Sequence, residues 1–198
     1  MRRLFSTVAV DAPPSRRTHR ETNKHAQALA KEQNPIVGYF DPLELGDKDF
    51  WEQGNEATIG FLREAEIKHG RVAMLAFTGA LVQSYGMHFD GKLNGMFYEK
   101  GVNPFEATPS AFATNPMGMA QILLFIGLTE GYTFPEGAWS GDMKREPGDL
   151  GYRVMRSADV MEEQQIKELK NGRAAMLGIM AFSAAHFIPG SVPFFFNA

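Results

Sequence analysis

Carboxylates, arginines and further nitrogen or oxygen donors recur inside two apolar stretches of the chain that share one pattern. Residues 64–75 read EAEIKHGRVAML, and residues 166–177, 102 positions later, read IKELKNGRAAML. Each copy carries a Glu five residues before an Arg, with an imidazole or an amide between them. The polar residues of the pattern are Glu66, His69 and Arg71 in the first copy, and Glu168, Asn171 and Arg173 in the second.

Oxygen and imidazole donors on apolar helices suit a hard metal ion that lies inside a hydrophobic ligand. Magnesium prefers oxygen donors and also accepts imidazole. A magnesium ion held by a macrocycle needs one further axial donor, which a Glu can supply while an Arg on a facing helix balances its charge. The structural alternative for the repeated stretches is two amphipathic helices with solvated charges. Further polar candidates on apolar segments are Gln83, Gln121, Glu130 and His186, although a lone core histidine is usually satisfied by hydrogen bonds.

Both copies are expected to be helical, because they lack proline and are rich in Ala, Leu, Met, Glu, Lys and Arg. The Glu and Arg of one copy lie about 500° apart around a helix, so each would pair better with a partner on another helix. A symmetric crossed pair of helices would bring Glu66 to Arg173 and Glu168 to Arg71. Small residues would let the two backbones approach closely, and they are Gly70, Ala73, Gly172 and Ala175.

The apolar segments and turn signals predict an all-α membrane protein with three transmembrane helices. If the two copies pack as a symmetric crossed pair, the Glu/Arg ion pairs link the first of these helices to the third. The first helix has ample length for a span only if Glu66, His69 and Arg71 are neutralised inside. The expected boundaries are a basic arm at residues 1–37, a three-helix domain at 38–198, helices at about 57–87, 116–132 and 161–187, and a loop at 88–115 that contains Gly and Pro.

Charge and composition narrow the classes of function. The chain has 198 residues and a net charge of −3, which argues against a nucleic-acid binder. It has no cysteine, and hence no disulfide or zinc–thiolate site, whereas 16 Phe and 11 Met suit a surface facing lipid or large apolar ligands. Lys and Arg concentrate before the first helix and between the second and third. With three spans, both basic regions fall on one side of the membrane, the side equivalent to cytoplasm.

The paired motifs ExxHGR and ExxNGR resemble those of the light-harvesting chlorophyll-binding antenna family of photosynthetic eukaryotes. Phe-Asp-Pro-Leu at residues 40–43 and the helix that carries Gln121 and Glu130 are also similar to that family, and the resemblance covers about residues 38–193. It implies an all-α membrane protein of three transmembrane helices, of which the first and third cross as a pseudo-twofold pair. It also implies pigment binding and no catalysed reaction. The chlorophyll magnesium ligands that it implies are Glu66, His69, Gln83, Gln121, Glu130, Glu168 and Asn171, with Arg71 and Arg173 paired to Glu168 and Glu66.

The chain departs from the family pattern in two places. Ala185 stands where the family often has Gln, and His186 lies one residue along, about 100° around the helix. His186 is therefore a candidate whose direct ligation the resemblance does not imply. The segment around Pro147 differs from the usual second Phe-Asp-Pro-Leu, which affects carotenoid docking on that side.

The short loops and the IPGSVP tail are most similar to the chlorophyll a/c antennae of dinoflagellates, with the diatom antennae close behind. The cofactors implied are chlorophyll a, chlorophyll c and carotenoids, namely peridinin or fucoxanthin together with diadinoxanthin. The partners implied are a photosystem core, with photosystem I favoured, neighbouring antenna proteins and thylakoid lipids, but no nucleic acid. The location implied is the chloroplast thylakoid membrane, with the N-terminus stromal.

Two other functions stay open at this point. A photoprotective relative would dissipate excitation, and acid-sensing carboxylates on the lumenal side would favour it; Asp90, Glu99 and Glu106 form no cluster in the sequence. A haem-binding membrane oxidoreductase would use histidines instead, and it predicts no Glu/Arg duplication. Its candidate ligands are His69, His88 and His186.

Overall fold

The computed structural model describes residues 27, 30–31, 36–46, 48–52, 55–87, 92–93, 96–97, 103–138, 140–151 and 158–192. Most of the predicted basic arm, and His88, Asp90 and Glu99, lie outside these residues. The regular secondary structure of the described residues is helical apart from one short antiparallel pair of strands. Its elements are α2 (Asn55–Ser84), β1 (Lys92–Leu93), β2 (Met96–Phe97), α3 (Pro104–Thr114), α4 (Pro116–Thr133) and α5 (Ala158–Phe187).

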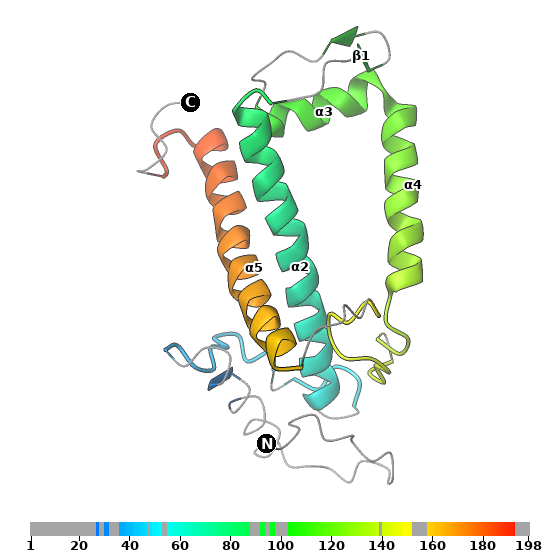
Figure 1. Ribbon diagram of the computed structural model, residues 1–198, viewed down its shortest axis with the longest axis vertical. Helices are drawn as coiled ribbons and strands as arrows, with labels where there is room; N and C mark the ends of the chain where they lie inside the picture. Colours follow the sequence, from blue (N-terminus) through cyan, green and yellow to red (C-terminus); the bar gives the residue numbers. More distant parts are fainter. Residues whose placement is uncertain are drawn as a thin grey trace. The chain divides into compact units, whose positions relative to one another are not determined.

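The chain divides into two compact units. The first combines Met1–Leu62 with Glu136–Lys144, and the second combines Arg63–Pro135 with Arg145–Ala198. Within the second unit, α2 and α5 lie side by side and run in the same direction, whereas α4 runs the opposite way (Figure 1). The second unit therefore holds both copies of the repeated stretch on two neighbouring parallel helices.

Helices α2 and α5 approach each other closely at two glycines, one from each copy. A Cβ atom on Gly70 would lie 3.1 Å from the Cα of Gly172, and one on Gly172 would lie 2.9 Å from the Cα of Gly70. Ala73 and Ala175, one turn further along, are also buried. The close approach expected at these small residues is confirmed. The crossing is backbone against backbone, so neither helix can shift without disturbing the other.

The loop predicted at residues 88–115 is wrong for its second half, which forms α3. The Asn103 side chain accepts a hydrogen bond from the backbone N–H of Phe105 at 3.1 Å, and Pro104 occupies the start of the helix. These are standard helix-start residues. Pro109 lies inside α3. The prediction missed this helix because it treated prolines as helix breakers. The hairpin of β1 and β2 also lies in the predicted loop.

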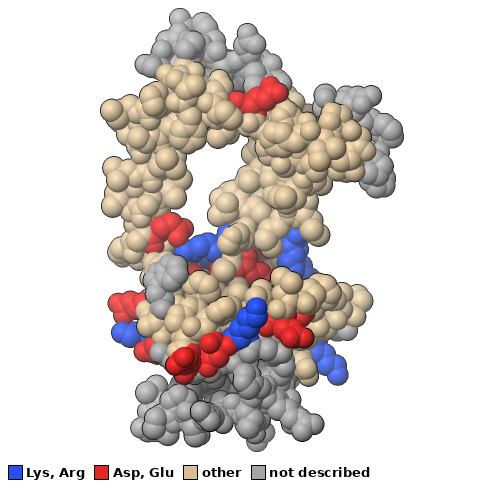
Figure 2. Space-filling view, turned by 180° about the vertical axis from the view of Figure 1, so that it is seen from behind, with Lys and Arg blue, Asp and Glu red and all other residues tan. Residues whose placement is uncertain are grey.

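Helix α4 buries none of its side chains. Residues 120–132 are all exposed, including Phe125 at 68% and Tyr132 at 90%. On the face shown in Figure 2, the upper parts of the helices carry almost no charge, and the charged side chains gather lower down. In the described part of the chain, no helix taken singly is long and apolar enough for a membrane crossing; α3 and α4, bent by 109° at their junction, meet that criterion as a pair.

The first unit contains the Phe-Asp-Pro-Leu segment, which forms a turn around Asp41. Its carboxylate accepts hydrogen bonds from the backbone N–H groups of Leu45 at 3.1 Å and Gly46 at 2.7 Å, and from the Tyr39 hydroxyl at 3.0 Å. Burial opposes the ionisation of Asp41, but these donors outweigh it and hold the pKa of the carboxyl below its ordinary value. In the same unit, Trp51 packs edge-on against Phe61 of α2 with ring centroids 5.3 Å apart.

The crossing predicts different effects for two glycine-to-alanine changes. Gly172→Ala should lower the melting temperature, because the new methyl group would collide with the Gly70 backbone. Gly79→Ala, in α2, is the matched control, since a Cβ there meets nothing within 4 Å. Alanine is more favourable than glycine inside a helix by roughly 0.5–1 kcal/mol, so the control should be neutral or stabilising. Thermal unfolding followed by circular dichroism would measure both, and equal effects would contradict this packing.

Candidate functional site

Two ion pairs join α2 to α5 on either side of the glycine crossing. Arg71 Nε donates to Glu168 Oε1 at 2.6 Å, and Arg173 Nε donates to Glu66 Oε1 at 2.6 Å. These are the two cross pairs to which the sequence duplication points. The four side chains remain between 31% and 41% exposed. The pairs therefore neutralise charge at the crossing while leaving the carboxylates accessible from outside.

Each of these carboxylates has one oxygen engaged and one to offer. Both arginine bonds use Oε1, so Oε2 of Glu66 and Oε2 of Glu168 can serve another ligand. A carboxylate whose charge is balanced by a guanidinium is a hard oxygen donor in a locally neutral site, which matches what magnesium prefers. The donor chemistry at the crossing thus fits two magnesium-containing ligands, one at each glutamate.

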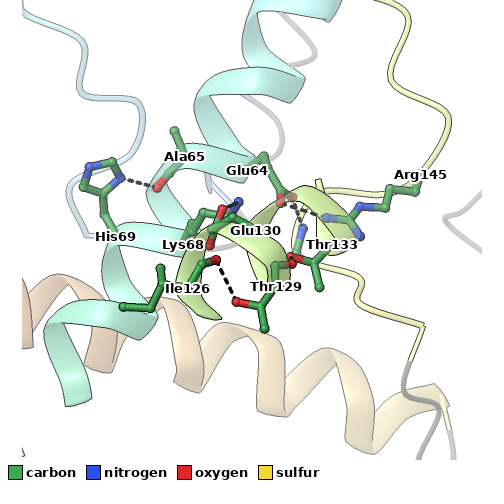
Figure 3. Close-up of polar contacts among 10 residues, drawn as sticks. Glu64, Ala65, Lys68, His69, Ile126, Thr129, Glu130, Thr133 and Arg145 are labelled. Carbon is green, nitrogen blue, oxygen red and sulfur yellow. Dashed lines mark hydrogen bonds and ion pairs between the residues drawn. The ribbon is translucent and has the colours of Figure 1, made fainter. Parts of the chain in front are cut away.

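His69 lies on the exposed surface of α2 and is held in one tautomer. Its Nδ1 lies 2.7 Å from the carbonyl oxygen of Ala65, one turn earlier (Figure 3). Because a carbonyl oxygen only accepts, Nδ1 carries the proton, and in a neutral imidazole this leaves the lone pair on Nε2. An exposed imidazole nitrogen whose partner nitrogen is fixed by a backbone carbonyl is the usual arrangement of a histidine metal ligand.

Glu64 is a polar residue of the site that sequence reasoning missed. It is only 8% exposed, and its carboxylate accepts from the backbone N–H of Gly148 at 2.5 Å and from Arg145 Nη2 at 3.1 Å. Arg71 Nη2 donates to the Gly148 carbonyl at 2.8 Å. The backbone of Gly148 therefore forms hydrogen bonds with two side chains of α2, through its N–H with Glu64 and through its carbonyl with Arg71. The repeat gave no signal for Glu64, because the equivalent residue of the second copy is Ile166.

Lys68 is a second missed residue, and it links α2 to α4. Its Nζ lies 2.6 Å from Glu130 Oε2 (Figure 3) and 5.5 Å from the centroid of the Phe134 ring. Glu130 thus has a charge partner on a neighbouring helix, as Glu66 and Glu168 do. A Lys adjacent to the histidine of the motif could have signalled this contact, but nothing in the sequence indicated which carboxylate it would reach.

The remaining candidates do not join the crossing. Asn171 is exposed on α5, Gln121 is exposed on α4, and Gln83 is half-buried near the end of α2. His186 instead contacts the start of α3, where its Nδ1 lies 3.1 Å from Asn103 Nδ2 and its ring stacks on Phe105 with centroids 5.7 Å apart. The structure therefore gives His186 a packing role between α5 and α3.

Comparison with known proteins places the chain in a family. The model of the chlorophyll a/b-binding protein family matches residues 25–187. The chain is 32% identical to a chloroplastic fucoxanthin–chlorophyll a-c binding protein of Trieres chinensis, over 80% of this chain and 78% of the relative. It is 34% identical to two such proteins of Phaeodactylum tricornutum, E and A, over 90% of this chain and 89% of each relative. The chain belongs to the chlorophyll a/b-binding protein family.

The paired charges predict strong coupling between Glu66 and Arg173. Arg173→Leu should lower the melting temperature, because it leaves a carboxylate without its counter-ion. The double variant Glu66→Gln with Arg173→Leu removes both charges and should recover part of the loss. We expect a coupling of about 0.5–3 kcal/mol, toward the lower end because solvent screens part of the interaction.

The exposed pair of Lys144 and Glu136 supplies the control for this cycle. Its side chains are 67% and 78% exposed, although the Nζ–Oε2 distance is only 3.0 Å. The same substitutions, Lys144→Leu and Glu136→Gln, should show little coupling, as is usual for surface pairs. Equal coupling in the two cycles would mean that the crossing pair is an ordinary surface contact.

Proposed function

We propose that the protein is a photosynthetic antenna, which holds chlorophylls and carotenoids, harvests light and passes the excitation to a photosystem. The observation that carries the proposal is the reciprocal pairing at the crossing, where each glutamate keeps one oxygen for a ligand. Chlorophyll, once bound, supplies the absorption and transfer of excitation. The protein's work is to fix the distance and orientation of the pigments, and it catalyses no reaction.

The chain's own donors have distinct tasks in this proposal. Glu66 and Glu168 would each hold a chlorophyll magnesium through Oε2, while Arg173 and Arg71 keep the carboxylates in place and cancel their charge. His69 offers Nε2, with its ring orientation set by Ala65. The remaining donors offer an amide or carboxylate oxygen from α2, α4 and α5, and they are Gln83, Gln121, Glu130 and Asn171.

The proposal extends to the membrane. Three helices, α2, α4 and α5, would cross the thylakoid membrane, with residues 1–37 as a basic arm and residues 38–198 as the pigment-binding domain. The opposite direction of α4 relative to α2 and α5 supports this arrangement. Both basic regions of the chain then lie on one side, which we assign to the stroma. Ion pairing of the motif residues lowers the cost of carrying charge through the membrane.

The names of the relatives guide the choice of pigments and partners. Three chloroplastic relatives are named for fucoxanthin and chlorophylls a and c. We therefore assign chlorophyll a, chlorophyll c and fucoxanthin to this chain, in preference to peridinin, with diadinoxanthin as a further carotenoid. The partners would be neighbouring antenna proteins and a photosystem core, with photosystem I favoured. Family membership leaves the haem-binding alternative without support.

The role of His69 is tested by reconstituting the chain with pigments. His69→Leu should lose about one chlorophyll per polypeptide, because leucine offers no donor. His69→Asn copies Asn171 of the second copy and should retain more pigment, since an amide oxygen can replace the imidazole. Chlorophyll per polypeptide is counted after pigment extraction. An unchanged count in His69→Leu would make His69 a surface residue without a pigment.

The orientation is tested by limited proteolysis of stroma-exposed membranes. Trypsin should cut in the basic stretch between Arg16 and Arg20 and leave Lys92 and Lys100 intact, because the connection between α2 and α3 would face the lumen. The fragments are identified by mass spectrometry, with ruptured membranes as the control in which all sites become available. Cleavage at Lys92 with a protected N-terminus would show the reverse topology.

A further inference from the structure

Glu130 differs from the other residues of α4 in its charge. It is the only charged residue of a helix that otherwise consists of apolar, glycine, threonine, glutamine and tyrosine residues. Its neighbours on the helix are exposed on all sides. A carboxylate on such a surface, turned toward lipid or an apolar ligand, is unfavourable unless its charge is balanced. The balancing charge must come from another element, since α4 contains no cation.

Lys68 of α2 supplies that charge, and it is directed toward α4 by two contacts. Its Nζ lies 2.6 Å from Glu130 Oε2 and 5.5 Å from the Phe134 ring centroid. Glu64, one turn earlier on α2, is engaged by Arg145 and Gly148 instead. In Figure 3, His69 points away from the Lys68–Glu130 pair. Lys68 therefore serves α4 and belongs to neither of the other polar groups beside it.

The bond from Lys68 uses only one carboxylate oxygen. Oε2 of Glu130 is engaged and Oε1 is left for a ligand, as at Glu66 and Glu168. The counter-ion differs, however, because it is a Lys of α2 and not an Arg of the opposite copy. Lysine's compact ammonium group acts as a point charge on a flexible stem, so it can balance Glu130 across the gap between α2 and α4.

We propose that Lys68 is the positioning residue and counter-ion of a third carboxylate ligand, Glu130, so that the pigment site on α4 is built from two helices. The inference rests on the proposed antenna function. Lys68 fixes the carboxylate through Oε2 and makes the site locally neutral, while Oε1 would be left to hold the magnesium of a chlorophyll. The site on α4 then requires α2 to be in place before it can bind its pigment.

The chain offers a matched control for this proposal. Lys170 stands in the second copy where Lys68 stands in the first, since the copies are offset by 102 residues. Lys170 is exposed on α5, and the described residues show no ion pair for it. The same substitution can therefore be made at two equivalent positions, of which only one faces a carboxylate of α4.

The experiment reconstitutes the full chain with a mixture of chlorophyll a, chlorophyll c and fucoxanthin. Chlorophyll per polypeptide and visible circular dichroism are measured for wild type, Lys68→Met and Lys170→Met. We expect Lys68→Met to lose about one chlorophyll together with its dichroism band, and Lys170→Met to match wild type. Equal pigment in the two variants would overturn the inference. A wild-type chain that binds no chlorophyll would instead overturn the antenna function on which it rests.

Two double variants separate ligand positioning from a simple tether between helices. Lys68→Met with Glu130→Gln lacks the ion pair but keeps a neutral amide oxygen, and it should regain the chlorophyll. Lys68→Glu with Glu130→Lys restores an ion pair but removes the donor from α4, and it should not regain it. The opposite result, recovery with the reversed pair only, would show that Lys68 merely ties α2 to α4. This comparison also holds if Lys68→Met alone fails to assemble.

Discussion

Two helix backbones touch at Gly70 and Gly172, and the rest of the second unit depends on that contact. It brings the two copies of the repeated stretch into register, so that each arginine reaches the glutamate of the other copy at 2.6 Å. A larger side chain at either glycine would separate the helices and break both pairs together. Packing and charge balance therefore depend on each other, because the small residues set the spacing between the helices, and this spacing lets each arginine reach its glutamate.

Charge balance also connects the crossing to the rest of this unit. Arg71 bonds both Glu168 and the carbonyl of Gly148, so the same guanidinium serves helix pairing and the attachment of the segment after α4. The Glu64 carboxylate accepts a hydrogen bond from the backbone N–H of the same glycine. The two helix copies are therefore not equivalent in their surroundings, even though their motifs are. Glu64, Glu66, Glu130 and Glu168 each have a cation from another element beside them.

The sequence allowed much of this arrangement to be predicted, because the duplicated motif leaves few ways to pair its charges. The Glu and Arg of one copy cannot reach each other around a helix, and small residues at equivalent positions indicate where two backbones can touch. The long helices also followed from their apolar composition, with ends within about three residues of those observed. In contrast, α3 was not predicted, because Pro109 lies inside it and proline usually ends a helix. The structure forms the helix nevertheless, and Asn103 caps its start.

The contacts that escaped prediction are those without a repeat to indicate them. Glu64 has an isoleucine as its counterpart. Lys68 has an equivalent lysine, Lys170, for which the described residues show no carboxylate partner on a neighbouring helix. The contacts of Glu64 and Lys68 depend on how α4 and the segment after it pack against α2. The residue pattern along a single helix does not indicate such tertiary contacts. For His186, the contact with Asn103 and Phe105 likewise arises only once α3 lies against the end of α5.

The central claim is that the crossing pairs hold glutamate oxygens ready for magnesium. An electron cryomicroscopy map of the pigmented protein tests it most directly. The account predicts tetrapyrrole density centred against Oε2 of both Glu66 and Glu168, with Arg173 and Arg71 retained on the Oε1 atoms. Arginines turned away from these carboxylates, or tetrapyrroles centred only on other residues, would contradict it.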